Sequence, residues 1–149
     1  MINPYMEQAL LEAKKAARDG EVPVGAVIVK SGNIIARAHN LKETDNNALA
    51  HAEVIAIDEA CKKLGTWRLD DSELYVTLEP CPMCAGAIIN SRLKAVYFGA
   101  YDSKAGACGS VVDLLKRGVF NHSPDVYSGI MEDACQSILT EFFKNLRVT

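Results

Sequence analysis

Residues 73–91 read ELYVTLEPCPMCAGAIINS and contain the change from strand to helix that decides the fold. The first six residues include Tyr, Val and Thr, which are typical of a strand. Pro80 begins a segment of small and apolar residues that extends to about Ser91 and predicts a helix. Cys81 and Cys84 lie near its start, three positions apart. A strand that leads directly into a helix indicates an α/β protein.

The alternation of helices and strands begins upstream of this stretch. Asn3 and Pro4 are residue types typical of a helix N-cap and first turn, and Gly20 is typical of the end of a helix. Gly65 likewise closes a second helix. The expected upstream elements are a helix from 4 to about 20, strands over 22–29 and 34–39, and a helix from about 51 to 64.

The pattern continues downstream of residue 91. We expect a strand over 94–98, a loop over 99–109, a short helix capped by Ser110 and ending at Leu115, and a last strand over 125–130. An apolar stripe then predicts a closing helix, with Ala134, Ile138, Leu139, Phe142, Phe143 and Leu146 on its buried face. Five strands alternating with helices predict a three-layer α/β/α sandwich around a central, five-stranded mixed sheet. Without a repeat or linker, residues 1–149 are expected to form one domain.

The composition excludes several classes of protein. Hydrophobic residues make up 49% of the chain and charged residues 23%, as in a soluble globular protein. No run approaches the roughly 18 apolar residues of a membrane helix, and the N-terminus lacks the apolar core of a signal peptide, so we expect a cytoplasmic protein. Five cysteines in such a protein favour metal binding, catalysis or burial over disulfides.

Cys81 and Cys84 have the spacing of metal ligands. Residues three apart on a helix share one face, so both thiolates can reach one ion. The start of a helix also favours the thiolate over the thiol. His51 is the natural third ligand, because imidazole and thiolate together suit zinc. Three protein ligands leave the fourth tetrahedral position to a water, whose pKa zinc lowers to about 7.

Glu53 is the expected proton carrier beside this site. It follows His51 by two residues, and positions i and i+2 of a regular helix do not face each other. Glu53 is therefore poorly placed to bind the same ion. If His51 occupies the non-helical cap position, however, both side chains can point into one pocket with only the imidazole on the metal.

Other interpretations of these motifs remain open at this point. Cys-Pro-x-Cys at the start of a helix is also typical of a glutaredoxin-like redox site. A single His-x-Glu pair carries little information, and a zinc-binding RNA module without turnover is a third possibility. The combination of H-x-E on one expected helix and P-C-x-x-C on the next is more specific, because it is the signature of zinc-dependent nucleobase deaminases.

Along nearly its whole length the chain resembles the bacterial tRNA-specific adenosine deaminases (the TadA family). The zinc motifs are common to the wider superfamily, whereas the later segments resemble the tRNA enzymes in particular. The resemblance is carried by EVPVGAV (21–27), HAE (51–53), YVTLEPCPMCAGA (75–87), SR (91–92), FGA (98–100), Asp102, Lys104, NH (121–122) and FF (142–143).

This resemblance implies a cytidine deaminase-like fold and a homodimer with one zinc ion per subunit. It also implies hydrolytic conversion of adenosine to inosine at the wobble position of a tRNA anticodon, with Glu53 as the proton shuttle. The target base would be turned out of the anticodon stem-loop into the pocket. The residues that the resemblance assigns to RNA contacts are Asn40, Asp102, Lys104, Asn121, His122 and Phe143.

Simpler roles exist for several of these residues. Asn40 can serve as a turn residue, Lys104 as a solvated lysine, and one of Phe142 and Phe143 as a core residue. The net charge of −3 shows no general attraction for RNA. Phosphate binding would then need a local cluster and should weaken as salt rises. The candidate residues are Lys104, Lys116, Arg117, Lys144 and Arg147.

The nearest alternative function keeps the chemistry and changes the substrate. A free-base or nucleoside deaminase, of the guanine or cytosine type, would use the same zinc site and the same glutamate. The spacing of the two motifs does not distinguish these substrates from RNA.

Overall fold

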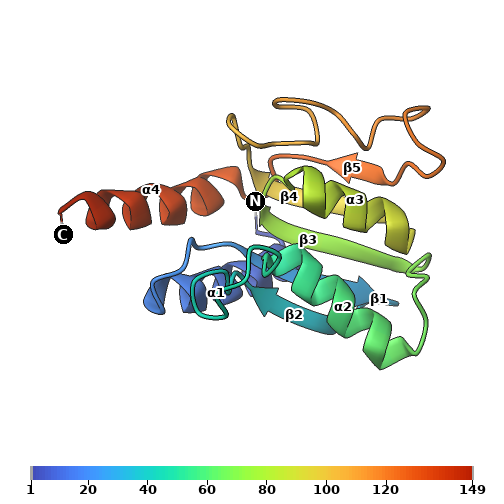
Figure 1. The fold of residues 1–149 in the computed structure, drawn as a ribbon, viewed down its shortest axis with the longest axis horizontal. Coiled ribbons are helices and arrows are strands. Elements are labelled where there is room, and N and C mark those ends of the chain that lie inside the picture. The colour runs from blue at the N-terminus through green and yellow to red at the C-terminus, as the bar shows by residue number, and fades with distance from the viewer. Residues whose placement is uncertain (1, 149) are drawn as a thin grey trace.

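The structure is a computed structural model that describes residues 2–148, with the side chains of residues 2–146. Figure 1 shows helices and strands in the expected alternation. In chain order the elements are α1 (Pro4–Arg18), β1 (Gly25–Lys30), β2 (Asn33–His39), α2 (Ala52–Leu64), β3 (Ser72–Leu78), α3 (Pro82–Ser91), β4 (Ala95–Ala100), β5 (Asp125–Tyr127) and α4 (Glu132–Val148).

The five strands form one mixed sheet in the order β2-β1-β3-β4-β5. β1 pairs antiparallel with β2 and with β3, whereas β3–β4 and β4–β5 are parallel pairs. The parallel pairs require crossover connections, and α3 supplies the one between β3 and β4. The predicted five-stranded mixed sheet is therefore confirmed.

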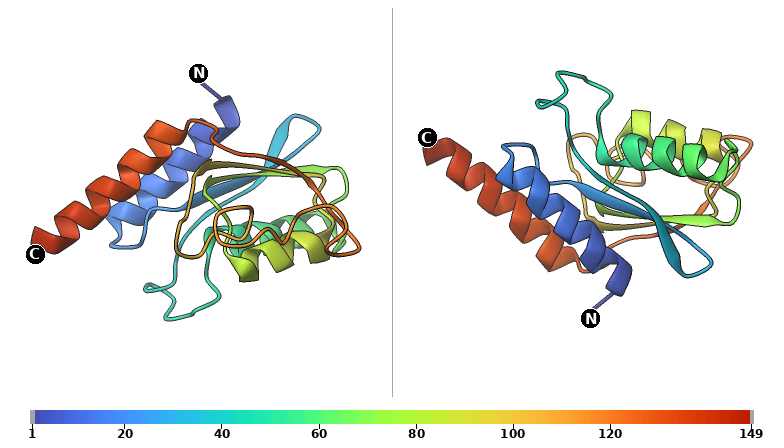
Figure 2. Two further views of the ribbon diagram at one scale, coloured as in Figure 1. Left: turned by 90° about the horizontal axis from the view of Figure 1, so that it is seen from above. Right: turned by 90° about the horizontal axis from the view of Figure 1, so that it is seen from below.

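Helices cover both faces of the sheet, which confirms the three-layer sandwich. In both views of Figure 2, α1 and α4 lie side by side on one face, and α2 and α3 lie together on the other. The larger apolar core lies beneath α2 and α3 and includes Ile28, Ile88 and Phe98. A smaller core beneath α1 and α4 includes Met6 and Tyr75. Within the described residues, no helix combines the length and apolar character needed to cross a membrane.

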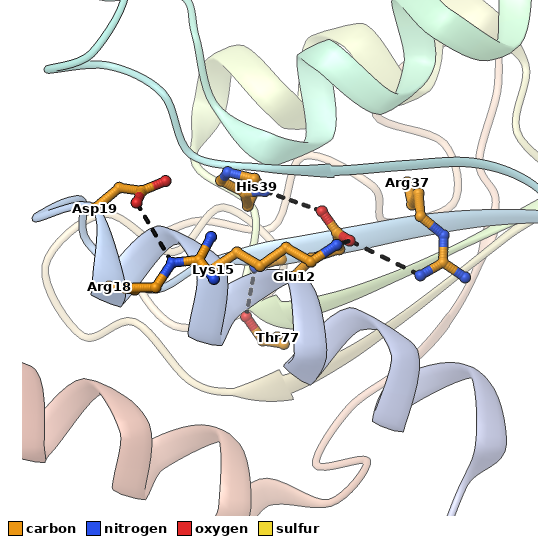
Figure 3. A network of polar contacts seen from close by, with 8 residues as sticks. Glu12, Lys15, Arg18, Asp19, Arg37, His39 and Thr77 are labelled. Atoms are coloured by element: carbon orange, nitrogen blue, oxygen red, sulfur yellow. Dashed lines mark hydrogen bonds and ion pairs between the residues drawn. The ribbon is translucent and has the colours of Figure 1, made fainter.

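A network of polar contacts fastens α1 to the antiparallel edge of the sheet (Figure 3). The buried carboxylate of Glu12 contacts Lys15 at 2.8 Å and Nδ1 of His39 at 2.9 Å, and Arg37 lies 3.8 Å from it. Two cationic partners, Lys15 and Arg37, and the polar contact with His39 make the burial of this carboxylate tolerable. His39 thus has a structural partner in Glu12.

Gly25 lets α1 approach the sheet closely. A Cβ atom at Gly25 would lie 1.9 Å from the backbone oxygen of Ala9 and 2.5 Å from the backbone nitrogen of Ala13. Its N–H donates to Oγ1 of Thr77 at 3.1 Å. The close approach therefore depends on the missing side chain and not on an unusual φ angle.

We expect Gly25→Ala to lower the free energy of unfolding by about 3 kcal/mol, because the obstructing atoms are helix backbone that cannot rotate away. Urea denaturation measures this loss. Gly86→Ala is the matched control: Gly86 lies within α3, and a Cβ there meets nothing within 4 Å. The control should be neutral or stabilising by up to about 1 kcal/mol. Equal stability of the two variants would contradict the close packing of α1 on β1.

Several boundaries differ from those expected. β1 begins at Gly25 and not at residue 22, because Pro23 has no N–H for the ladder. α3 begins at Pro82 and not at Pro80, since a residue before proline avoids the helical region and Cys81 is such a residue. The last strand, expected to reach residue 130, ends at Tyr127. A left-handed Gly129 follows shortly after this end.

Two expectations about the second half of the chain are wrong. The short helix expected from Ser110 to Leu115 is absent, and the chain there forms turns around a bridge between Cys108 and Asp113. The expected stripe of α4 is only partly buried. Leu139 is buried, but Phe143 and Leu146 are 42% and 58% exposed, because the second half of α4 extends beyond the sheet (Figure 1).

Candidate metal centre and active site

The site forms where the ends of several elements meet. β3 and β4 are parallel, so their carboxyl ends lie at the same edge of the sheet, with Leu78 paired to Ala100. β1 runs in the opposite direction and begins at this edge, where Gly25 pairs with His39 at the end of β2. Open sheets of this kind bind ligands beyond the carboxyl ends of their parallel strands.

His51 and Cys81 occupy equivalent positions at the N-terminal ends of α2 and α3. Each is the N-cap of its helix in an extended conformation: His51 precedes α2 with φ −83° and ψ 147°, and Cys81 precedes α3 with φ −77° and ψ 174°. Neither side chain caps its own helix. Cys84 lies in the first turn of α3. The cap geometry inferred for His51 is therefore what the structure contains.

The three predicted ligands lie together. Nδ1 of His51 is 3.6 Å from Sγ of Cys81 and 3.5 Å from Sγ of Cys84. Among the described residues these three form the group whose donor atoms all lie within 4.8 Å of one another. Zinc bonds of about 2.3 Å to sulfur and 2.0–2.1 Å to nitrogen, at tetrahedral angles, place sulfur and nitrogen about 3.6 Å apart. The donor set and its spacing fit a tetrahedral zinc ion with one open position.

Electrostatic interactions within the group favour a thiolate. The hydrogen bond to the Cys84 thiol lowers the pKa of Cys81 to about 4, with a further contribution from His51. The same bond, together with burial, raises the pKa of Cys84. The hydrogen bond with Cys81 in turn raises the pKa of His51. At neutral pH the group therefore holds at least one anionic sulfur, the form that binds a metal.

Glu53 lines the same pocket as His51 and Cys81 but is outside the group of three candidate ligands. It is in the first turn of α2 and only 4% exposed. Burial raises the pKa of its carboxyl to about 7. A carboxyl that both accepts and releases protons near neutrality suits general acid–base catalysis.

A pocket of about 200 Å³ is lined by His51, Cys81 and Glu53 and by two of the residues expected to bind RNA. Asn40 lines it from the end of β2 and is 8% exposed, with its Oδ1 3.4 Å from the backbone N–H of Lys42. Asp102 lines it from the loop that follows β4. Apolar walls come from Val22, Val24, Leu78 and Ala105.

A larger groove of about 950 Å³ adjoins this pocket and shares Leu78 and Asp102 with it. Lys104 and Phe143 both line the groove, on the loop after β4 and on α4 respectively. An exposed cation and an exposed ring beside a pocket are suited to a phosphate and a stacked base. The structure thus brings four of the six expected RNA contacts to one continuous surface.

The other two expected contacts lie elsewhere. Asn121 is exposed on the long loop before β5, and Nε2 of His122 is 2.7 Å from the carbonyl of Leu93, at the opposite end of α3 from Cys81. Their roles in RNA binding stay predictions. Of the cationic cluster, Lys104 and Lys144 line the groove, Lys116 and Arg117 line a separate cavity, and the side chain of Arg147 lies outside the described residues.

Glu21 secures the loop that carries Lys42 on one side of the pocket. Its carboxylate is fully buried and accepts hydrogen bonds from the N–H of Glu43 and from the N–H and hydroxyl of Thr44. Burial alone would raise the pKa of Glu21, but the bonds from Thr44 and Glu43 outweigh it and lower the pKa. The loop thus requires the ionised form of this carboxyl.

We expect wild type to be about 2 kcal/mol more stable than Glu21→Gln at neutral pH, because these hydrogen bonds are charge-assisted. A carboxyl whose pKa is lowered on folding contributes stability above its unfolded pKa and loses it as pH falls through the folded pKa. The difference between the two proteins should therefore shrink in acid. Urea unfolding at a series of pH values measures it, and a difference that widens on acidification would contradict the assignment.

One residue of the site was not singled out from the sequence. Glu79 lines the metal pocket and is 2% exposed, with hydrogen bonds from Ser110 and from the backbone of Asp102 and Cys108. Burial opposes ionisation, but these bonds prevail and lower the pKa of Glu79. The sequence feature that could have indicated Glu79 is its charge, because it stands between an apolar strand and Pro80.

Comparison with known proteins shows that the chain is a deaminase by family. Residues 3–147 match the MafB19-like deaminase family. Among curated proteins, the chain is 57% identical over 143 residues to a tRNA-specific adenosine deaminase of Bacillus subtilis (strain 168), across 96% of this chain and 89% of the relative.

Two solved structures are similar to the fold. One, from work on A-to-I editing by tRNA:A34 deaminases at the wobble position, has a TM-score of 0.88 and 47% identity, and the match covers 91% of this chain and 99% of that one. The other is a guanine deaminase from Bacillus subtilis, with a TM-score of 0.65 and 44% identity over 76% of this chain and 74% of that one. The chain is thus similar to deaminases that act on RNA and to one that acts on a free base.

Proposed function

Because the chain belongs to the tRNA-specific adenosine deaminases, we propose that it hydrolyses adenosine to inosine at the wobble position of a tRNA anticodon, with release of ammonia. The observation that carries this proposal is the group of His51, Cys81 and Cys84 together with a buried Glu53, which lines one pocket with His51 and Cys81. The likeness to tRNA:A34 deaminases supports RNA as the substrate.

One zinc ion per subunit would be held by His51, Cys81 and Cys84. When bound, zinc supplies the Lewis acid that lowers the pKa of a water. Glu53 would accept one proton from the attacking water and deliver it to N1 of adenine. It would then accept the second proton of that water, from the hydroxyl added at C6, and pass it to the amino group, which leaves as ammonia. Its position inside the pocket but outside the ligand group supports this role.

The RNA would occupy the pocket and the adjoining groove. Asn40 and Asp102 contribute hydrogen-bonding groups in the pocket that receives the target nucleotide. Lys104 and Phe143 face the groove, where a flanking phosphate and base would lie. Asn121 and His122 contact more distant parts of the anticodon stem-loop in this proposal.

We also propose that the chain acts as a single deaminase domain in a cytoplasmic homodimer. Exposed apolar side chains in the loop between β4 and β5 support a protein interface, since Val111 and Phe120 are 54% and 52% exposed. Light scattering coupled to size exclusion tests the assembly. A mass of twice the chain is expected, and a monomer at all concentrations would contradict it.

A substrate panel tests the activity and separates it from the nearest alternative. The protein is incubated with an anticodon stem-loop RNA, guanine, cytosine and cytidine in separate reactions, and released ammonia and inosine are measured. We expect inosine from the RNA and no ammonia from the three small molecules. Ammonia from guanine without inosine in RNA would replace the proposal with the free-base reaction, towards which the similar guanine deaminase structure points.

A further inference from the structure

Four glutamates of the described chain are buried, and each needs a reason for its burial. Glu12, Glu21, Glu53 and Glu79 are all at most 4% exposed. Glu53 faces the metal donors, Glu12 joins α1 to β2, and Glu21 secures the loop after β2. Glu79, like Glu21, accepts its hydrogen bonds from a single loop, and the loop around Glu79 carries Asp102 and Ala105, which line the pocket.

Both oxygens of the Glu79 carboxylate are satisfied by this loop. Oε1 accepts the N–H of Asp102 at 3.0 Å and the hydroxyl of Ser110. Oε2 accepts the N–H of Cys108 at 3.0 Å and the N–H of Ser110 at 3.1 Å. The loop therefore folds around the carboxylate as around a bound anion.

The rest of the loop is built to surround Glu79 closely. A Cβ atom at Gly106 would lie 2.4 Å from both Cδ and Oε2 of Glu79. The N–H of Ala107 donates to the carbonyl of Pro80 at 2.8 Å, so the loop also follows the segment that leads to Cys81. A side chain at Gly106 would push the loop away from this segment.

The anchored loop carries groups that face the substrate. Asp102 and Ala105 line the metal pocket, and Lys104 lines the adjoining groove. Oδ1 of Asp102 accepts the N–H groups of Lys104 and Ala105 at 3.0 and 3.1 Å, which ties these residues into one turn. The turn has no helix or strand of its own, so its placement depends on the contacts at Glu79.

We propose that Glu79 is a positioning residue that holds the loop of residues 102–110 at the metal site, so that Asp102 and Lys104 are presented to the RNA. The evidence that Glu79 anchors this loop is the set of hydrogen bonds between them. Only the identity of the substrate rests on the proposed function.

Glu79→Gln tests the proposal, because an amide has a single acceptor oxygen and turns an N–H₂ group towards N–H donors. We expect faster amide hydrogen exchange in residues 102–110, a KM for the stem-loop RNA raised about tenfold, and a kcat within about threefold of wild type. Zinc content should be unchanged. Glu73→Gln is the matched control: Glu73 lies at the other end of β3 and accepts a bond from the hydroxyl of Tyr97. It should leave KM and loop exchange as in wild type.

Unchanged exchange in residues 102–110 would overturn the proposal, as would loss of zinc or a collapse of kcat at constant KM. If Glu79→Gln does not fold, Ser110→Ala tests the same anchoring contact. This variant removes one donor and should raise exchange and KM in the same direction by a smaller factor. Failure of the wild type to form inosine would contradict the proposed function alone, because the exchange measurement decides the anchoring without any substrate.

Discussion

Replacing Glu53 by glutamine is expected to lower kcat for inosine formation about a thousandfold, while the protein keeps its zinc. Glutamine has nearly the shape of glutamate but cannot accept a proton from water or deliver one to the base. Glu53 lies outside the ligand group, so its loss should leave the three metal donors in place. Single-turnover kinetics on a stem-loop RNA and metal analysis of the same preparation measure the two effects.

Glu59→Gln is the control for Glu53→Gln. Glu59 lies on the same helix but is exposed, so the variant makes the same change of charge away from the pocket. We expect activity close to wild type. If Glu53→Gln retained activity, another group would be the proton carrier. If it lost its zinc together with activity, Glu53 would belong to the metal site itself.

Replacing Cys84 by alanine is expected to remove both the metal and the activity. Cys84 is completely buried, and its Sγ lies 3.5 Å from Nδ1 of His51. With two protein ligands left, zinc should fall from one ion per chain to near zero, and the thermal midpoint should drop because metal binding stabilises the folded state. Metal analysis after dialysis and a thermal melt measure these changes.

Cys135→Ala separates the loss of metal from the loss of a buried side chain. Cys135 is as deeply buried as Cys84 but lies on α4 and packs into the smaller core. This control should lose some stability through its cavity and keep both zinc and activity. Stoichiometric zinc in Cys84→Ala would show that the ligand set is wrong.

Local signals were sufficient to predict the fold. Asn3 caps α1 by accepting the N–H groups of Tyr5 and Met6, and Gly65 ends α2 in the left-handed conformation. These features depend on residues close in sequence. The three layers then follow from the alternation of strands and helices.

The placement of His51 also followed from a local argument. Spacing alone indicated that His51 and Glu53 cannot both face one pocket within a regular helix, and the cap position resolves the conflict. The structure has His51 at that position and Glu53 in the first turn. Their chemical roles, as metal ligand and proton carrier, stay predictions until the variants are measured.

The loop after β4 was not predictable because its conformation depends on distant contacts. Ser110 resembled a helix cap in the sequence, but its hydroxyl and N–H are both bound to Glu79, which lies 31 residues away. Glu79 was missed for the same reason: its hydrogen-bond partners are distant in the sequence.

The apolar stripe of α4 was misleading for a different reason. Hydrophobic periodicity shows which face of a helix is apolar, but it does not show what covers that face. Leu139 packs against the sheet, whereas Phe143 lines the groove. An apolar residue beside the active pocket has the same sequence signal as a core residue.

The geometry of the metal site explains the reaction but does not distinguish between substrates. The similar structures include both a tRNA:A34 deaminase and a guanine deaminase, and both match over most of this chain. What favours RNA is the groove beside the pocket, with Lys104 and Phe143, together with the higher identity to tRNA-specific relatives.

The most direct test of the account is deamination of a stem-loop RNA in water enriched in heavy oxygen, followed by mass spectrometry of the nucleosides. With the zinc-loaded protein, inosine should appear at the wobble position and carry the heavy oxygen, because the new oxygen atom comes from water. Chelation should abolish the product, and added zinc should restore it. Unlabelled inosine, or labelled inosine formed equally well by the chelated protein, would contradict a zinc-dependent hydrolysis.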